Sequence, residues 1–201
     1  MRKIIVQEFL TLDSVMQAPG GPEEDTSSGF QYGGWVAPYF TVEPDPIFDV
    51  IMQKWMQPGD ILLGKNTFQI FKAYWPKHTE DWPGINDVNK YVLSSSLEYS
   101  DWQNTLFLKS IDDVINLKAL GDGDIRVYGS AAVVQELFKY ELVDELCLLT
   151  FPIILGVGKR LFSDESIPAA FQLTDHLASS NGVVFTHYQK AGEVTTGTIA
   201  E

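Results

Sequence analysis

The chain reads DIRVYGSAAVVQELFKYELVDELCLLTFPIILGVGKRLF over residues 124–162, which predicts a strand, a glycine turn, a helix, a loop and a second strand. The β-prone run 125–128 stops at Gly129, and Ser130 stands at the N-cap position of a helix expected over residues 131–140. A strand that passes through glycine into a helix can present backbone N–H groups to an anion such as a nucleotide phosphate. The same pattern also occurs in tight turns that bind nothing, so it leaves both interpretations open.

A second turn of this kind is expected at Gly64, where a short strand over residues 60–63 leads into a helix. Further out, Asp45 and Pro46 predict a helix start, with aspartate as N-cap and proline in the first turn. The remaining expected elements are strands at 3–12 and 90–94, a helix at 46–56, a glycine-, proline- and acid-rich loop at 14–34 that resembles a lid, and a hairpin formed by 171–177 and 183–189 around Asn181 and Gly182.

The order of these elements predicts the fold class. Strands alternate with helical patterns up to residue 150, and a hairpin closes the chain. This favours a three-layer α/β/α domain whose central sheet is mostly parallel with an antiparallel C-terminal hairpin. The turns at Gly64 and Gly129 would then face one crevice at the carboxyl ends of the strands. We expect one domain over residues 1–190 and a frayed tail over 191–201.

Composition narrows the range of functions. The net charge of −13 over 201 residues argues against a nonspecific nucleic-acid binder or a membrane-surface binder, because both need a basic face. Cys147 is the only cysteine, which excludes an internal disulfide and a cysteine-cluster zinc site, and no metal site is expected. The N-terminus has no hydrophobic signal core and no apolar run is long enough for a membrane span, so we expect a cytoplasmic protein.

The segments VYGSAAVVQELF, LVDELCLL and PIILGVGKRLF together resemble the C-terminal reductase domain of bifunctional riboflavin-biosynthesis deaminase-reductases, which belongs to the dihydrofolate reductase superfamily. The resemblance covers about residues 2–188 and implies a dihydrofolate-reductase-like fold. It also implies NADPH as cofactor and hydride transfer to a pyrimidine- or pterin-type small molecule, as in 5-amino-6-(5-phosphoribosylamino)uracil reductase. The zinc deaminase signature is absent from this chain, so the resemblance concerns the reductase part alone.

The resemblance also implies the cofactor-binding residues. LLGKNTF is similar to the superfamily's Gly-Arg-x-Thr-aromatic motif, with Lys65 in place of the usual arginine, so the charge for an adenosine 2′-phosphate is kept and the bidentate fork is lost. Ser130 replaces the second glycine of the superfamily's Gly-Gly pair, and we expect a trans peptide bond with the serine N–H and hydroxyl facing the pyrophosphate. The full predicted set is Met16, Gly64, Lys65, Thr67, Ser94, Ser95, Gly129, Ser130, Ala131, Ala132 and Val133.

The predicted substrate side is built around two acids. Asp49 lies among apolar helix residues and is either a solvated carboxylate or the acid that faces the substrate, and Asp13 is the second catalytic candidate. The residues expected to share one face of this helix, with Phe48 and Met52 beside it, are Ile47, Val50, Ile51, Lys54 and Trp55. The predicted substrate-binding residues are Phe9, Trp35, Leu155 and Gly156. Lys159 and Arg160 could meet a substrate phosphate, or could be an exposed charge pair.

Alternatives to this reductase remain open. One is true dihydrofolate reductase activity, against which stand the missing second glycine and the long acidic lid. Another is a nucleotide-binding or dimer-forming module without catalysis. The resemblance implies a homodimer, and the apolar segment 147–155 is the expected interface.

Overall fold

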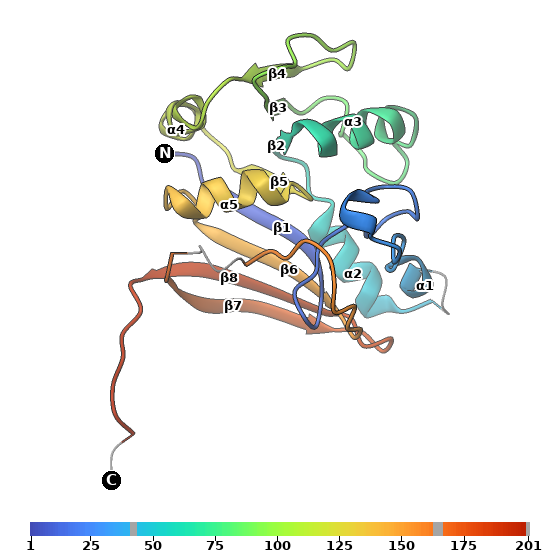
Figure 1. Ribbon diagram of the computed structural model, residues 1–201, viewed down its shortest axis with the longest axis vertical. Helices are drawn as coiled ribbons and strands as arrows, with labels where there is room; N and C mark the ends of the chain where they lie inside the picture. Colours follow the sequence, from blue (N-terminus) through green and yellow to red (C-terminus); the bar gives the residue numbers. More distant parts are fainter. Residues whose placement is uncertain (41–43, 163–166, 200–201) are drawn as a thin grey trace.

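The computed structural model describes residues 1–40, 44–162 and 167–199, and these build one mixed sheet with helices on both faces (Figure 1). Within the described residues the sheet has eight strands. From edge to edge they are β4 (Thr105–Leu108), β3 (Lys90–Leu93), β2 (Asp60–Gly64), β5 (Ile125–Tyr128), β1 (Ile4–Thr11), β6 (Glu145–Phe151), β8 (Val184–Gly192) and β7 (Ala170–Ala178).

The strand directions confirm the expected fold class. The pairs from β4 to β6 are parallel, whereas β6–β8 and β7–β8 are antiparallel. The central strands β1 and β6 are buried on both faces, as their near-continuous apolar runs require in a parallel sheet. The C-terminal hairpin turns at Gly182, whose φ of 86° is costly for a residue with a side chain. The strand β8 runs two residues into the segment predicted as a tail.

The helices divide into two layers, each with its own hydrophobic cluster. On one face, α2 (Pro46–Trp55) and α3 (Lys65–Tyr74) bury Phe48, Ile51, Trp55 and Phe68. On the other face, α4 (Ile111–Ala119) and α5 (Ala131–Lys139) pack through valines and Leu137, and α5 crosses the sheet in Figure 1. The shorter helical turns are η1 (Ser27–Gly29), α1 (Ala37–Phe40) and η2 (Trp75–Lys77). None of the described helices is long and apolar enough to span a membrane.

The rotation of α2 differs from the prediction. The cap itself is confirmed, because the Asp45 carboxylate accepts hydrogen bonds from the N–H groups of Ile47 and Phe48. Its other oxygen accepts from the N–H and the hydroxyl of Ser180 in the distant hairpin turn, at 2.6 and 2.7 Å. Ile51 and Trp55 of the predicted apolar face are buried, whereas Ile47 and Val50 on the same predicted face are exposed and Phe48 is buried in their place.

The predicted dimer segment lies mostly inside the molecule. Residues 147–151 belong to β6, which is paired on both sides and almost entirely buried, so this part of the segment cannot meet another protein. Cys147 itself is 5% exposed and packs in the core. Burial raises the pKa of its thiol to about 12. Of the predicted interface, Pro152 and Ile154 are exposed.

Candidate functional site

A cleft of about 830 Å³ opens at the carboxyl ends of β2 and β5. Its lining residues are Met16, Gln17, Ala18, Pro19, Glu24, Asp25, Gly64, Lys65, Asn66, Thr67, Gln69, Ile70, Leu93, Gly129, Ser130, Ala131, Ala132, Val133, Gln135, Glu136 and Lys159. The sequence-predicted cofactor residues therefore meet in one place, except Ser94 and Ser95, which do not line this cleft.

The two glycine turns are bonded to each other across the cleft. The N–H of Gly64 donates to the Ser130 hydroxyl at 2.9 Å, and that hydroxyl donates to the carbonyl of Tyr128 at 3.0 Å. The Thr67 hydroxyl, from the first turn of α3, donates to the Gly129 carbonyl at 3.2 Å. Consequently the starts of α3 and α5 are held as one unit.

Ser130 lines the cleft, and its hydroxyl already has two internal partners. It accepts from the Gly64 N–H and donates to the Tyr128 carbonyl, and it makes no side-chain cap to α5, while its predicted contact with a pyrophosphate stays a prediction. The peptide bond between Gly129 and Ser130 is trans, as expected, because no cis bond occurs in the described residues. Gly129 has a φ of 59°, a conformation that glycine adopts at little cost.

Lys65 reaches from the start of α3 to the turn after β3. Its ammonium group donates to the Ser96 hydroxyl at 3.2 Å. Ser94 is buried and its hydroxyl accepts from the N–H groups of Ser96 and Leu97, so it shapes this turn, whereas Ser95 is exposed. Sequence analysis missed Ser96, although the third serine of the run was the available signal.

The 14–34 loop closes one side of the cleft through contacts with the segment after β6. Gln17 accepts from the Lys159 N–H at 3.0 Å, and the Lys159 ammonium group pairs with Asp25 at 2.6 Å. The Glu24 carboxylate accepts from the N–H groups of Gly20 and Gly21, and its burial raises its pKa. The loop is thus packed in place, and Lys159 is already neutralised by an internal partner.

Asp13 stands at the end of β1 and fastens the same segment. Its carboxylate accepts from the Thr11 hydroxyl at 2.6 Å and from the N–H groups of Leu155 and Gly156 at 3.2 and 2.9 Å. Arg160 donates to the Asp13 carbonyl and carboxylate, which completes the contact. Although partial desolvation acts in the opposite direction, these hydrogen bonds lower the pKa of Asp13 to about 2. Asp13 is therefore ionised at neutral pH and holds Leu155 and Gly156 in place.

Asp49 does not have the surroundings expected for a substrate-facing acid. It is exposed in the first turn of α2 and is absent from the cleft lining. Its neighbour Phe48 is buried in the core instead. Of the two interpretations of Asp49, the exposed position agrees with the solvated carboxylate and not with a carboxylate in an apolar pocket.

Phe9 and Trp35 both belong to a group of contacting rings that we call the aromatic cluster. Its members are Phe9, Trp35, Tyr39, Phe40, Trp55, Trp82, Tyr128 and Phe151. Phe9 stacks on Trp55 with ring centres 4.8 Å apart, and Phe9 and Trp35 both contact Phe151 edge-on. The Tyr128 hydroxyl donates to Gln7 at 3.2 Å. Two of the four predicted substrate-binding residues, Phe9 and Trp35, therefore belong to a packed group of rings, and their contact with a substrate stays a prediction.

Sequence analysis also missed Glu8. This residue is 3% exposed on β1 and accepts a hydrogen bond from the N–H of Gly129 at 3.0 Å. Burial raises its pKa well above the ordinary value for glutamate. The available signal was a carboxylate that alternates with Val6 and Leu10 on one face of a central strand.

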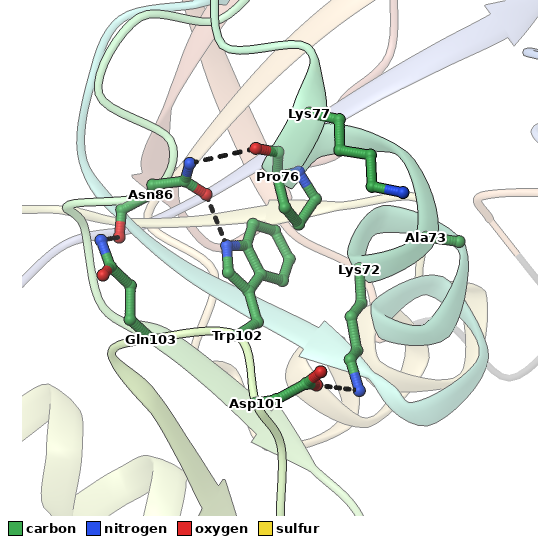
Figure 2. A pocket seen from close by; sticks show the side chains of 8 residues that line it. All are labelled: Lys72, Ala73, Pro76, Lys77, Asn86, Asp101, Trp102 and Gln103. Carbon is green, nitrogen blue, oxygen red and sulfur yellow. Dashed lines mark hydrogen bonds and ion pairs between the residues drawn. The ribbon is translucent and has the colours of Figure 1, made fainter.

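A second hollow, of about 480 Å³, lies at the other end of α3 and is shown in Figure 2. Asn86 bridges its walls, since its amide accepts from the Trp102 indole N–H and donates to the Pro76 carbonyl. Lys72 is paired with Asp101. Because most of its polar groups already bond to one another, we place the functional site in the larger cleft.

Comparison with known proteins identifies the family of the chain. A model of the RibD C-terminal domain matches residues 2–185. The chain is 27% identical over 199 residues to the uncharacterized protein YyaP of Bacillus subtilis (strain 168), covering 95% of this chain and 96% of that protein.

Solved structures share the fold. A putative riboflavin biosynthesis protein from Shewanella sp. PV-4 has a TM-score of 0.65 and 20% identity, with 94% of this chain and 98% of that chain covered. A pyrimidine reductase-like protein from Corynebacterium diphtheriae has a TM-score of 0.59 and 13% identity, covering 96% and 93%. Dihydrofolate reductase from Enterococcus faecalis, in complex with NADP(H), has a TM-score of 0.57 and 13% identity, covering 94% and 96%.

Proposed function

Because the chain belongs to the RibD C-terminal domain family, we propose that it is an NADPH-dependent reductase that transfers a hydride to a pyrimidine- or pterin-type substrate. The observation that carries this proposal is the cleft at Gly64 and Gly129, where two helix starts and Lys65 face a common space. Such a space suits a dinucleotide, whose phosphates need backbone N–H groups and a cation.

The space beside the glycines supports the fit of a cofactor. A side-chain carbon added at Gly64 would come within 3.1 Å of Val133, and one added at Gly129 would come within 3.3 Å of Thr67. Both turns therefore depend on glycine to keep the helix starts close together. Glycine in these turns also lets a ligand approach the backbone closely.

Each part of the cofactor has candidate partners in this chain. The first turn of α5, at Ala131 and Ala132, would hold the pyrophosphate through its backbone N–H groups. Lys65 and Ser96 would hold the adenosine 2′-phosphate. Met16 would cover the cofactor from the 14–34 loop. When bound, NADPH supplies the hydride, and the residues of the chain align the reactants and exclude water.

Asp13 is given a positioning role in this proposal. A carboxylate with a pKa of about 2 has no proton to donate at neutral pH. Its hydrogen bonds to Leu155 and Gly156 instead fix the loop that closes the site beside β1. This loop would set one boundary of the substrate pocket.

A pyrimidine of riboflavin synthesis is the substrate we propose first, in line with the family and with the Shewanella relative. Lys159 and Arg160 are the cations nearest in sequence to that loop, and both are paired with aspartates. A phosphoribosyl group would therefore have to compete with Asp25 and Asp13 for them. A pterin, the alternative substrate, would not have to compete with these aspartates for Lys159 and Arg160.

The first test is a titration with NADPH and with NADH, followed by nicotinamide fluorescence. We expect NADPH to bind more tightly, and Lys65→Ala to weaken NADPH binding about tenfold, because one charge-assisted hydrogen bond is lost. Lys77→Ala, an exposed lysine at the second hollow, is the matched control and should change the affinity less than twofold. If neither cofactor binds the unaltered protein, the proposal is wrong.

A substrate screen separates the remaining alternatives. NADPH oxidation with the ribosylated diaminopyrimidine supports the first substrate, and oxidation with dihydrofolate supports the dihydrofolate reductase alternative. Cofactor binding without oxidation of NADPH by any pterin or pyrimidine would favour the non-catalytic nucleotide-binding module. The homodimer stays a prediction, which the mass of the protein in solution would test.

A further inference from the structure

Glu8 occupies an apolar position in the middle of the sheet. On β1 it lies between Val6 and Leu10, on the face covered by α5, and its register partner on β6 is Leu148. Val6, Leu10 and Leu148 all belong to the hydrophobic cluster that α5 covers. A carboxyl group at such a position is costly unless it is paired or uncharged.

The carboxyl group of Glu8 has one hydrogen bond and no charged partner within the described residues. One oxygen accepts from the Gly129 N–H at 3.0 Å, and the other is buried without a partner there. The titratable groups on the neighbouring strands are Arg126 and Tyr128 on β5, and Glu145 and Cys147 on β6. Arg126 bonds to Gln7 and Glu145 pairs with Lys3 and His187, so neither pairs with Glu8, and Tyr128 and Cys147 are normally neutral at pH 7. The charged residues of α5, Glu136 and Lys139, pair with each other at 3.7 Å at the surface. Nothing described here would stabilise an ionised Glu8, and burial raises its pKa accordingly.

Gly129 is held from both sides by this arrangement. Its N–H donates to Glu8 beneath the cleft, and its carbonyl accepts from Thr67 on α3. The peptide groups that follow begin α5 and line the cleft. The orientation of these N–H groups therefore depends on the bond to Glu8.

We propose that Glu8 is a positioning residue of the cofactor cleft, a neutral carboxyl group that holds the Gly129 N–H without placing a negative charge beneath the cofactor's phosphates. This inference rests on the proposed function. It assigns a role to the charge state as well as to the hydrogen bond, because an ionised Glu8 would repel the same phosphates.

The first measurement needs no cofactor. Carboxyl ¹³C NMR of the unaltered protein, assigned with Glu8→Gln, should show a protonated Glu8 at pH 7, and the amide signal of Gly129 should shift when Glu8 loses its proton at higher pH. An ionised Glu8 at pH 7 would overturn the proposal.

The second measurement is NADPH affinity in two variants of similar volume. Glu8→Gln keeps a neutral acceptor and should bind within twofold of the unaltered protein at pH 7, whereas Glu8→Met fills the space without an equivalent acceptor and should bind about fivefold more weakly. Above the pH at which NMR shows Glu8 ionising, the unaltered protein should weaken relative to Glu8→Gln, a change that a purely structural role would not produce.

The outcomes distinguish this inference from the proposed function. If the unaltered protein binds NADPH and folded Glu8→Met binds equally well, or Glu8→Gln is as weak as Glu8→Met, the positioning role is wrong and the function stands. If Glu8→Met does not fold, the pH comparison between the unaltered protein and Glu8→Gln decides. If the unaltered protein binds no NADPH, the proposed function itself fails.

Discussion

The cleft at Gly64 and Gly129 and the aromatic cluster lie near the same end of β1 but are built by opposite means. The cleft is open, has a mixed polar and apolar lining and is shaped by glycines, and its helix starts are bonded together through Ser130 and Thr67. The aromatic cluster is packed, and Phe9, Trp55 and Phe151 fill it. The difference teaches that the cleft has a preformed backbone that does not depend on large side chains, whereas the aromatic cluster consists of rings whose packing stabilises the fold. In the proposed function, the first would hold the cofactor and the second would border the substrate.

Phe9→Ala should show the largest effect of this difference. Removing the ring that stacks on Trp55 leaves a cavity in the cluster, so we expect the free energy of unfolding to fall by about 3 kcal/mol. NADPH affinity, measured under conditions where the variant is folded, should change less than threefold, because Phe9 does not line the cleft. Urea denaturation measures the first quantity, with the exposed Leu12→Ala as control. If the free energy of unfolding falls by less than about 1 kcal/mol, the packing of Phe9 in the cluster does not stabilise the fold as proposed.

Asp13→Asn should have the next largest effect, and its size should depend on pH. The pKa of Asp13 is about 2 in the folded protein, below its ordinary value of 3.8, so its contribution to stability is present above pH 3.8 and is lost as the pH falls through 2. We expect the free energy of unfolding of the unaltered protein to exceed that of the variant by about 2 kcal/mol at pH 6. This difference should shrink towards pH 2. Denaturation across pH 2–6 measures this, and the exposed Asp49→Asn is the control, which should change stability by less than about 0.5 kcal/mol at pH 6. A difference that did not depend on pH would contradict the assignment.

Lys159→Ala should have the smallest effect. It removes the ion pair that joins the 14–34 loop to the segment after β6 and leaves Asp25 unpaired at the edge of the cleft. The cost in stability should stay below about 1 kcal/mol, and NADPH binding should weaken about twofold at low salt and less at high salt. Lys190→Ala, which breaks a comparable pair with Glu141, serves as control. Tighter binding in Lys159→Ala would show that the pair obstructs the cleft.

The cleft could be predicted from the sequence because its main signals are local. A strand, a glycine and a helix start follow one another at Gly64 and again at Gly129, and parallel strands bring both turns to one edge of the sheet. The mostly parallel order of the fold followed from the alternation of strands and helices for the same reason.

What the sequence did not show depends on contacts between distant residues. Apolar residues surround α2 on several sides, so the helix pattern did not specify which of them are buried, and its N-cap Asp45 is bonded to the distant Ser180. The Ser130 hydroxyl accepts a hydrogen bond from Gly64, a partner far away in the sequence that the local pattern could not give. Glu8 was overlooked because its contact with Gly129 results from the register of β1 against β5, which places it beneath Gly129.

The burial of Cys147 has a practical consequence for studying motion in this protein. The only thiol of the chain is enclosed between paired strands, and its pKa of about 12 leaves almost no thiolate at neutral pH. A cysteine introduced on the 14–34 loop could therefore be labelled selectively with a fluorophore without first removing the native residue. Because Cys147 would remain unlabelled, the fluorescence of that label would report only on the response of the loop to a ligand.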